Sequence, residues 1–310
     1  MSDFKFGLIH APLTPFAPNA HGQTGAVDHA TYAKVLDFHI AHGAEGLAIP
    51  THAGESVSLT ADERKALLAF AIKHVAGRVP VVANVSEAGT EIAADLAAHA
   101  RAAGAAAIIA SVPYYWTPPQ SMLVEHFATI AEKGGLPLFV WNAPEEMNNV
   151  EVKAQTMVEL LQRSPNTVGL IDVSLDWQYM IEVASSCGAA RKGFQFISGS
   201  EYMISAGATG ATGMLTPLSS VAPKLVRELY DLCRAEKYAE ARPVQEDAAL
   251  LFRALKESGA IGLKAAAKYL GRDCGIPRPP LPPMGAEATQ DLIATLSTSG
   301  RANSEPRGWA

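Results

Sequence analysis

The sequence predicts an α/β fold, a (β/α)8 TIM barrel with a C-terminal helical extension. Eight short apolar runs alternate with stretches of helical pattern, and each run is apolar on both faces, as in a parallel sheet covered by helices. The chain has 310 residues, of which 48% are hydrophobic, and these supply the length and the core of one large barrel. A doubly wound sheet is the alternative. No G-x-G-x-x-G motif follows the first run, so the barrel is favoured.

The eight expected strands are brief and recur at the spacing of strand–helix units. They span residues 6–10, 46–50, 81–85, 106–111, 138–142, 167–172, 196–198 and 210–215. Start signals mark the helices between them. Asp28 can cap a helix that runs to Ala41, and TADE at residues 60–63 is typical of a capping box before a helix over residues 65–75. The remaining helices are expected over residues 90–103, 121–133, 153–162, 176–186 and 201–206.

The pattern changes after Leu215, where helical stretches follow one another with no strand between them. Residues 222–235, 238–258 and 261–270 are expected to form helices. The sequence PRPPLPP at residues 277–283 predicts a stiff extended connector before a last helix near residues 286–296. We therefore predict a barrel over residues 1–217, a C-terminal helical domain over 218–296 and a frayed tail over 297–310.

Charge and composition argue against several classes of protein. The formal charge of −6 argues against a nucleic-acid partner, because phosphate binding requires clustered Lys and Arg. The most apolar stretch, residues 102–112, is shorter than the roughly 20 residues that span a bilayer, and MSDFKFG lacks the apolar core of a signal peptide, so no membrane partner is expected. Cys187, Cys233 and Cys274 are odd in number and widely spaced, which indicates a reducing, cytoplasmic location.

Residues that can carry chemistry gather directly after the expected strands, where the active site of such a barrel lies. These segments are PTHAGES at 50–56, PYYW at 113–116, WNAPEE at 141–146, GLIDVS at 169–174 and SGSE at 198–201. The order and spacing of GES, PYY, NAP and SG resemble the dihydrodipicolinate synthase and N-acetylneuraminate lyase family of Schiff-base aldolases. The resemblance extends from Phe6 to Leu296 and includes KAAAKYLG at 264–271.

The resemblance implies the same barrel with a C-terminal helical domain, a small-molecule substrate, and assembly into homodimers or homotetramers. Family members bind a 2-oxo acid to a lysine near the end of the sixth strand, but the matching position here is Ile171. An isoleucine cannot form an imine. The family's tyrosine at the end of strand five is Trp141, and the substrate-binding arginine of the synthase branch is matched by Glu146. His52 and Ala53 stand where two threonines are usual.

We expect His52 and Tyr115 to be catalytic, because an imidazole and a phenol can both move protons. The expected substrate-binding residues are Trp141, Asn142, Glu146, Ile171, Asp172, Gly199 and Ser200. Each has a plainer interpretation: His52 and Asp172 could be structural. Tyr115, which in synthase relatives reaches into a neighbouring subunit's site, could be an interface aromatic. His52, Glu146 and Asp172 on three loops are weak evidence for a metal site, so neither a metal nor another cofactor is expected.

Three functions remain open at this point. The first is a lyase-like enzyme that acts on a small oxo-acid-type or related polar metabolite by lysine-free acid–base chemistry. The second is a family-typical pyruvate-dependent aldolase or synthase that uses another lysine. The third is a non-catalytic small-molecule binding protein on the same barrel.

Overall fold

The structure, a computed structural model, describes residues 4–19, 24–298 and 300–309. It confirms the predicted fold class, because eight parallel strands form a closed barrel in the order β1-β10-β9-β8-β7-β6-β5-β4. The barrel strands are β1 (Leu8–His10), β4 (Gly46–Ile49), β5 (Val81–Asn84), β6 (Ala107–Ser111), β7 (Leu138–Asn142), β8 (Thr167–Asp172), β9 (Gln195–Ser198) and β10 (Gly213–Thr216). Each overlaps one of the eight predicted apolar runs, and their residues are almost all buried.

Two short strands lie outside the barrel and were not predicted. β2 (Phe16–Pro18) and β3 (Thr24–Val27) form an antiparallel pair in which Phe16 is the register partner of Val27. Their sequences, FAP and TGAV, carry a proline and a glycine that disfavour strands, so the pattern alone gave no signal. The Phe16 ring is buried and has the Lys264 ammonium 4.2 Å and the Arg278 guanidinium 4.4 Å from its centroid. These tertiary contacts fix the segment.

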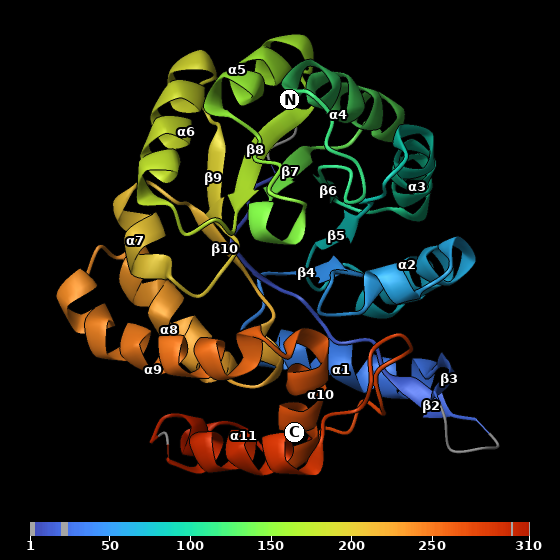
Figure 1. The fold of residues 1–310 in the computed structure, drawn as a ribbon, viewed down its shortest axis with the longest axis vertical. Helices are drawn as coiled ribbons and strands as arrows, with labels where there is room; N and C mark the ends of the chain where they lie inside the picture. Colours follow the sequence, from blue (N-terminus) through green and yellow to red (C-terminus); the bar gives the residue numbers. More distant parts are fainter. Residues whose placement is uncertain (1–3, 20–23, 299, 310) are drawn as a thin grey trace. The chain divides into compact units, whose positions relative to one another are not determined.

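The chain divides into two compact units. The first consists of residues 4–7 and 80–215, and its helices are α3 (Thr90–Ala103), α4 (Gln120–Gly134), α5 (Ala154–Arg163), α6 (Trp177–Ala190) and α7 (Met203–Ala208). Helices α3 to α6 pack in sequence order, each against the next, around the strands of this unit (Figure 1). The Phe4, Phe6 and Phe139 rings pack edge to face, with Phe6 and Phe139 4.9 Å apart. Short strand–helix connections thus place the carboxyl ends of β5 to β9 together.

The second unit consists of residues 8–79 and 216–309. Its helices are α1 (His29–Ala41), α2 (Ala61–Val75), α8 (Pro223–Arg234), α9 (Tyr238–Lys256), α10 (Gly259–Tyr269) and α11 (Ala286–Thr298). The predicted capping box is present, because Glu63 N donates to Thr60 Oγ1 over 3.2 Å and Thr60 N donates to Glu63 Oε2 over 2.9 Å. Asp28 caps α1 through Thr31 N. Helices α9, α10 and α11, orange to red in Figure 1, pack on one another.

The described part of the expected frayed tail is tied to the second unit. A single 3-10 turn, η4 (Ala302–Ser304), precedes Glu305, which is buried. The Glu305 carboxylate accepts hydrogen bonds from the backbone nitrogens of Lys224, at 3.0 Å, and Leu225, at 2.9 Å, in the first turn of α8. It therefore caps a helix far away in sequence. The predicted boundaries at residues 217 and 296 stay predictions. Among the described residues, every helix is too short or too polar to span a membrane.

Candidate active site

The expected site residues belong to both compact units: His52 lies in the second unit, and the others lie in the first. In the first unit, Trp141, Ile171 and Ile197 are register partners on the adjacent strands β7, β8 and β9. All three side chains are buried, and Ile171 has no exposed surface. Register partners on parallel strands share a face of the sheet. Near the carboxyl end of β8, the sixth strand of the barrel, the side chains of Trp141, Ile171 and Ile197 therefore form an apolar row across three strands, and Ile171 is at its centre.

Gly199, which follows β9, packs directly on this row. A Cβ atom added at Gly199 would lie 2.6 Å from Val173 Cγ2, 2.9 Å from the Asp172 carbonyl oxygen and 3.0 Å from Ile171 Cγ2. Its backbone nitrogen donates to the Asp172 carbonyl over 2.7 Å. Only glycine fits here without displacing its neighbours. The structure thus brings Ile171 and Gly199, both expected to contact substrate, into close approach.

Asn142 and Asp172 point to the other face of the sheet and bind each other. Asn142 Nδ2 donates to Asp172 Oδ1 over 2.8 Å, and Asn142 Oδ1 accepts from Val152 N over 2.9 Å. Ser174 Oγ donates to Asp172 Oδ2 over 2.9 Å. Tyr179, on α6, donates its hydroxyl to the Val152 carbonyl over 2.6 Å. The two residues therefore lie toward the start of α5 and α6 and hold the loops that follow β7 and β8.

The same environment sets the protonation of Asp172. Burial raises the pKa of this carboxyl above its ordinary value, and the hydrogen bonds from Asn142 and Ser174 oppose that rise. Both carboxylate oxygens are occupied by these donors. This arrangement suits a positioning role, which was one of the two interpretations of Asp172.

Tyr115 lies on the loop after β6, and its side chain is 74% exposed. Its ring meets the Trp116 ring edge to face at 5.1 Å. The backbone of this loop is fixed by Asn148 Nδ2, which donates to the Tyr114 carbonyl over 3.0 Å and to the Tyr115 carbonyl over 3.2 Å. Tyr114 donates its hydroxyl to Glu87 over 2.6 Å. A fixed loop therefore presents the Tyr115 side chain outward.

The remaining expected residues of the first unit differ in exposure. Glu146 is exposed and lies in the 3-10 turn η2 (Pro144–Glu146), where its backbone nitrogen donates to the Ala143 carbonyl over 3.0 Å. Ser200 is buried, and its carbonyl accepts from Ser198 Oγ over 2.8 Å. Glu146 can therefore meet a solute, whereas Ser200 shapes the turn after β9.

In the second unit, His52 lies on the loop of residues 51–56 that follows β4, and it is exposed. The loop is tightly turned: Glu55 N donates to the His52 carbonyl over 2.8 Å, and Ser56 N donates to the Thr51 carbonyl over 3.1 Å. Thr14 Oγ1 donates to the Gly54 carbonyl over 2.6 Å. The imidazole is thus carried on a fixed backbone at the carboxyl end of a barrel strand.

Glu55 anchors this loop through a buried cluster that the sequence did not reveal. Lys264 Nζ on α10 lies 2.6 Å from Glu55 Oε1, and Arg278 N donates to Glu55 Oε2 over 2.7 Å. Burial lowers the pKa of Lys264, and the Glu55 charge opposes that shift. The sequence held one indication of this cluster. Lys264 is the single charged residue of the apolar stretch IGLKAAA, and a lysine buried with such a stretch needs an acidic partner.

Two buried histidines lie next to each other in the second unit. His10 at the end of β1 is buried, with its Nδ1 3.1 Å from His39 Nδ1 on α1. No cluster of three His, Cys, Asp or Glu side chains within the described ranges could hold a metal ion.

Comparisons with known proteins agree with this architecture. Residues 5–299 match the model of the dihydrodipicolinate synthetase family. The chain is 33% identical to the 4-hydroxy-tetrahydrodipicolinate synthase of Bartonella bacilliformis, over 95% of this chain and 98% of the relative. It is 34% identical to the enzyme of that name from Rhizobium meliloti, over 96% and 99%. The crystal structure of dihydrodipicolinate synthase from Aquifex aeolicus matches with a TM-score of 0.88 at 29% identity, over 94% and 97% of the two chains.

Proposed function

The chain belongs to the dihydrodipicolinate synthetase family, and we propose that it is a lyase-like enzyme of this family. Unlike the Schiff-base aldolases that it resembles, it works without a Schiff base. Its substrate is a small oxo-acid-type or related polar metabolite. His52 and Tyr115 act as general acid and base, and Glu146 and Trp141 contact the substrate. The same proposal takes the protein to be a homodimer or homotetramer, in which the exposed Tyr115 meets a second copy.

The observation that carries this proposal is the environment of Ile171. By the family resemblance, Ile171 stands where the substrate-binding lysine is usual. It is fully buried between Trp141 and Ile197 and packs on Gly199. The space around Ile171 is apolar and filled by these side chains, so it leaves no open route by which the amine of another lysine could reach this position.

The distribution of the lysines supports the same conclusion. The sequence has 12 lysines, and all of them lie in the described part of the chain. Lys264 is buried and paired with Glu55, Lys65 on α2 is half-buried, and the others are exposed. A Schiff-base lysine needs a neutral amine in contact with the substrate. A buried ammonium held 2.6 Å from a carboxylate fits that requirement poorly.

The relatives favour a second candidate, a pyruvate-dependent aldolase or synthase that uses another lysine. The curated relatives named above carry the synthase name and match nearly the full length of this chain. Under this candidate the imine forms at one of the twelve lysines, and Lys264 is the one with a buried environment. The two candidates therefore differ in a single covalent step.

Borohydride trapping separates the two candidates. The protein is incubated with pyruvate and sodium borohydride, and the adduct is sought by intact mass and peptide mapping. A lysine-free enzyme gives no site-specific pyruvate adduct. A stoichiometric adduct on one lysine, lost when that lysine becomes Arg, would establish the second candidate instead. A known family synthase treated in parallel serves as the positive control.

A turnover panel then tests the acid–base proposal. Oxo acids, hydroxy acids and related polar metabolites are followed by NMR with the wild-type protein, His52→Ala and Tyr115→Phe. Turnover that falls at least about 100-fold in His52→Ala would support the proposal, since general acid–base groups contribute about that much. His99→Ala, on the outer helix α3, is the matched control. Ligand-induced thermal shifts with no turnover would point to the binding-protein alternative.

A further inference from the structure

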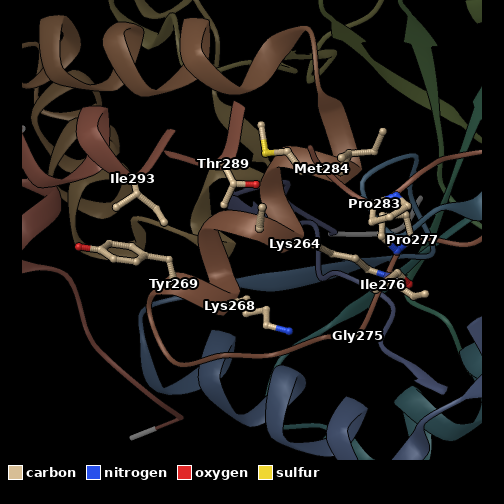
Figure 2. A pocket seen from close by; sticks show the side chains of 12 residues that line it. Lys264, Lys268, Tyr269, Gly275, Ile276, Pro277, Pro283, Met284, Thr289 and Ile293 are labelled. Carbon is tan, nitrogen blue, oxygen red and sulfur yellow. The ribbon is translucent and has the colours of Figure 1, made fainter. Parts of the chain in front are cut away.

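A pocket in the second unit lies among the C-terminal helices, and one residue of its lining, Lys264, is paired with Glu55 in the loop that carries His52. It is formed by α10, by the chain around Gly275–Pro277 and Pro283–Met284, and by α11, and its volume is about 360 Å³ (Figure 2). Volumes of roughly 300–1,000 Å³ are typical of small-molecule sites. The pocket is thus large enough for a small ligand, and every residue that lines it belongs to one compact unit.

The walls of the pocket are mainly apolar. Ile261 comes from α10, Ile276 from the connecting chain, Met284 from the segment before α11, and Ile293 from α11 itself. In Figure 2 the Met284, Thr289 and Ile293 side chains lie on the α11 side of the pocket. Such walls favour a hydrocarbon or aromatic body.

The charged groups of the lining are all of one sign. Lys264 and Lys268 line the pocket, and none of the described residues that line it is acidic. Tyr269 and Thr289 add two hydroxyl groups. The Lys268 side chain extends toward the chain at Gly275 in Figure 2, away from α11. The pocket is therefore amphipathic, with two cations and two hydroxyl groups among mainly apolar side chains.

The two lysines differ in how firmly they are held. Lys264 is 2% exposed and paired with Glu55 at 2.6 Å, so its ammonium stays in place and its charge is offset by the carboxylate. Lys268 Nζ lies 3.0 Å from Asp273, but these side chains are 65% and 54% exposed. Exposed pairs contribute little, so a ligand carboxylate can replace Asp273 at Lys268 with a small loss.

We infer that this pocket binds a small amphipathic carboxylate, with its apolar body against Ile261, Met284 and Ile293 and its carboxylate at Lys268. Lys264 stays paired with Glu55, and the Tyr269 and Thr289 hydroxyls offer further donors. The inference does not depend on the reaction proposed above, although Lys264 also anchors the loop that carries His52 through Glu55. A neighbouring pocket between α9 and α11 is lined by Arg253, Glu257 and Asp291, so its mixed charges give no such selectivity.

Isothermal titration calorimetry on the full chain tests this inference with octanoate, 1-octanol, octylamine and butyrate. Octanoate should bind at one saturable site, about tenfold more tightly than 1-octanol, as a charge-assisted hydrogen bond would require. Butyrate lacks the apolar body and should bind at least about tenfold more weakly than octanoate. Equal affinities for octanoate and 1-octanol, tighter binding of octylamine, or no saturable binding of octanoate would overturn the inference.

Variants locate the binding. Lys268→Gln should weaken octanoate about tenfold and leave 1-octanol unchanged. Lys237→Gln, which removes another lysine from an exposed pair, should change neither. Ala265→Phe should fill the pocket and abolish binding of both; Ile293→Trp serves the same purpose if the first variant fails to fold. Unchanged octanoate binding in Lys268→Gln, or in a folded pocket-filling variant, would contradict the assignment.

Discussion

Lys264 Nζ lies 2.6 Å from Glu55 Oε1, and the two side chains are 2% and 0% exposed. Glu55 has a φ of 55°, in the left-handed region that a non-glycine residue rarely adopts. The pair therefore fixes a strained residue within the loop that carries His52. It joins this loop to α10, so the C-terminal helices hold the position of a candidate catalytic residue.

We predict that Lys264→Met lowers the free energy of unfolding by about 3–5 kcal/mol, because it leaves the Glu55 charge buried without its partner. Urea denaturation followed by circular dichroism measures the loss. Lys268→Met is the matched control, since its pair with Asp273 is exposed and should contribute at most about 1 kcal/mol. Combining Lys264→Met with Glu55→Gln should cost about 0.5–3 kcal/mol less than the sum of the single changes. Equal losses in the two lysine variants would refute the buried-pair account.

The barrel could be predicted because buried parallel strands are continuous apolar runs. Local capping motifs such as the Thr60–Glu63 box also mark where helices begin. Features set by distant partners could not be predicted. Glu305 caps α8, and Phe16 packs against Lys264 and Arg278. Neither contact leaves a local pattern in the sequence. Composition alone therefore did not indicate β2, β3 or the cap that Glu305 provides.

The site loops could be predicted from the strand ends, but the direction of each side chain required register. Trp141 and Ile171 share one face, whereas their neighbours Asn142 and Asp172 share the other and bind each other. Successive residues of a strand alternate between the two faces of the sheet. Once the strand bounds are known, the face on which each of these residues lies therefore follows from the sequence. The Glu55–Lys264 pair had no such local signature, because a barrel strand loop and a C-terminal helix are far apart in sequence.

We predict that acid destabilises the protein through His10 and His39. Burial lowers the pKa of both, that of His39 to about 3. The charges of His39, Arg227 and His42 lower the pKa of His10 further, and those of Arg272 and His42 lower the pKa of His39 further. The folded state keeps both neutral, while the unfolded chain takes up protons below about pH 6.5. Stability is therefore present above pH 6.5 and falls as the pH drops toward 3, by up to about 1.4 kcal/mol per pH unit for each histidine.

Urea unfolding at intervals from pH 7 to pH 5 measures this slope. His39→Gln keeps a polar side chain but cannot titrate, so it should flatten the slope by up to about 1.4 kcal/mol per pH unit. His99→Gln removes a half-buried imidazole on α3 and controls for loss of a histidine elsewhere. A slope in His39→Gln as steep as in the wild type would count against the buried pair as its source.

We predict opposite effects for two glycine-to-alanine changes. Gly199→Ala would place a methyl group 2.6 Å from Val173 Cγ2 and 2.9 Å from the Asp172 carbonyl, so it should cost about 1–3 kcal/mol. Gly188 lies within α6, and a Cβ atom added there would have no atom within 4 Å apart from the backbone of its own helix. Gly188→Ala should therefore stabilise the protein by up to about 1 kcal/mol. Thermal melts of both variants decide the matter. A neutral Gly199→Ala would mean that Ile171 and Val173 can move aside.

The last prediction concerns Ile171→Lys, which we expect not to restore pyruvate aldolase activity. The new ammonium would be buried beside Trp141 and Ile197, where an unpaired charge destabilises the fold by several kcal/mol. Ile171→Met, which conserves volume, should cost less than about 1.5 kcal/mol and controls for repacking. By the family resemblance, Trp141 and Glu146 also stand where other residues are usual, so we expect an amine alone not to suffice.

Aldolase assays and borohydride trapping on the folded variant test this. Substantial activity in Ile171→Lys alone would disprove the prediction and make the lysine the only missing part. Adding Trp141→Tyr and Glu146→Arg should raise activity above that of the single variant, because a proton relay and a carboxylate-binding cation are then present together. If the triple variant forms a trapped imine but does not turn over, then the defect lies beyond these three positions.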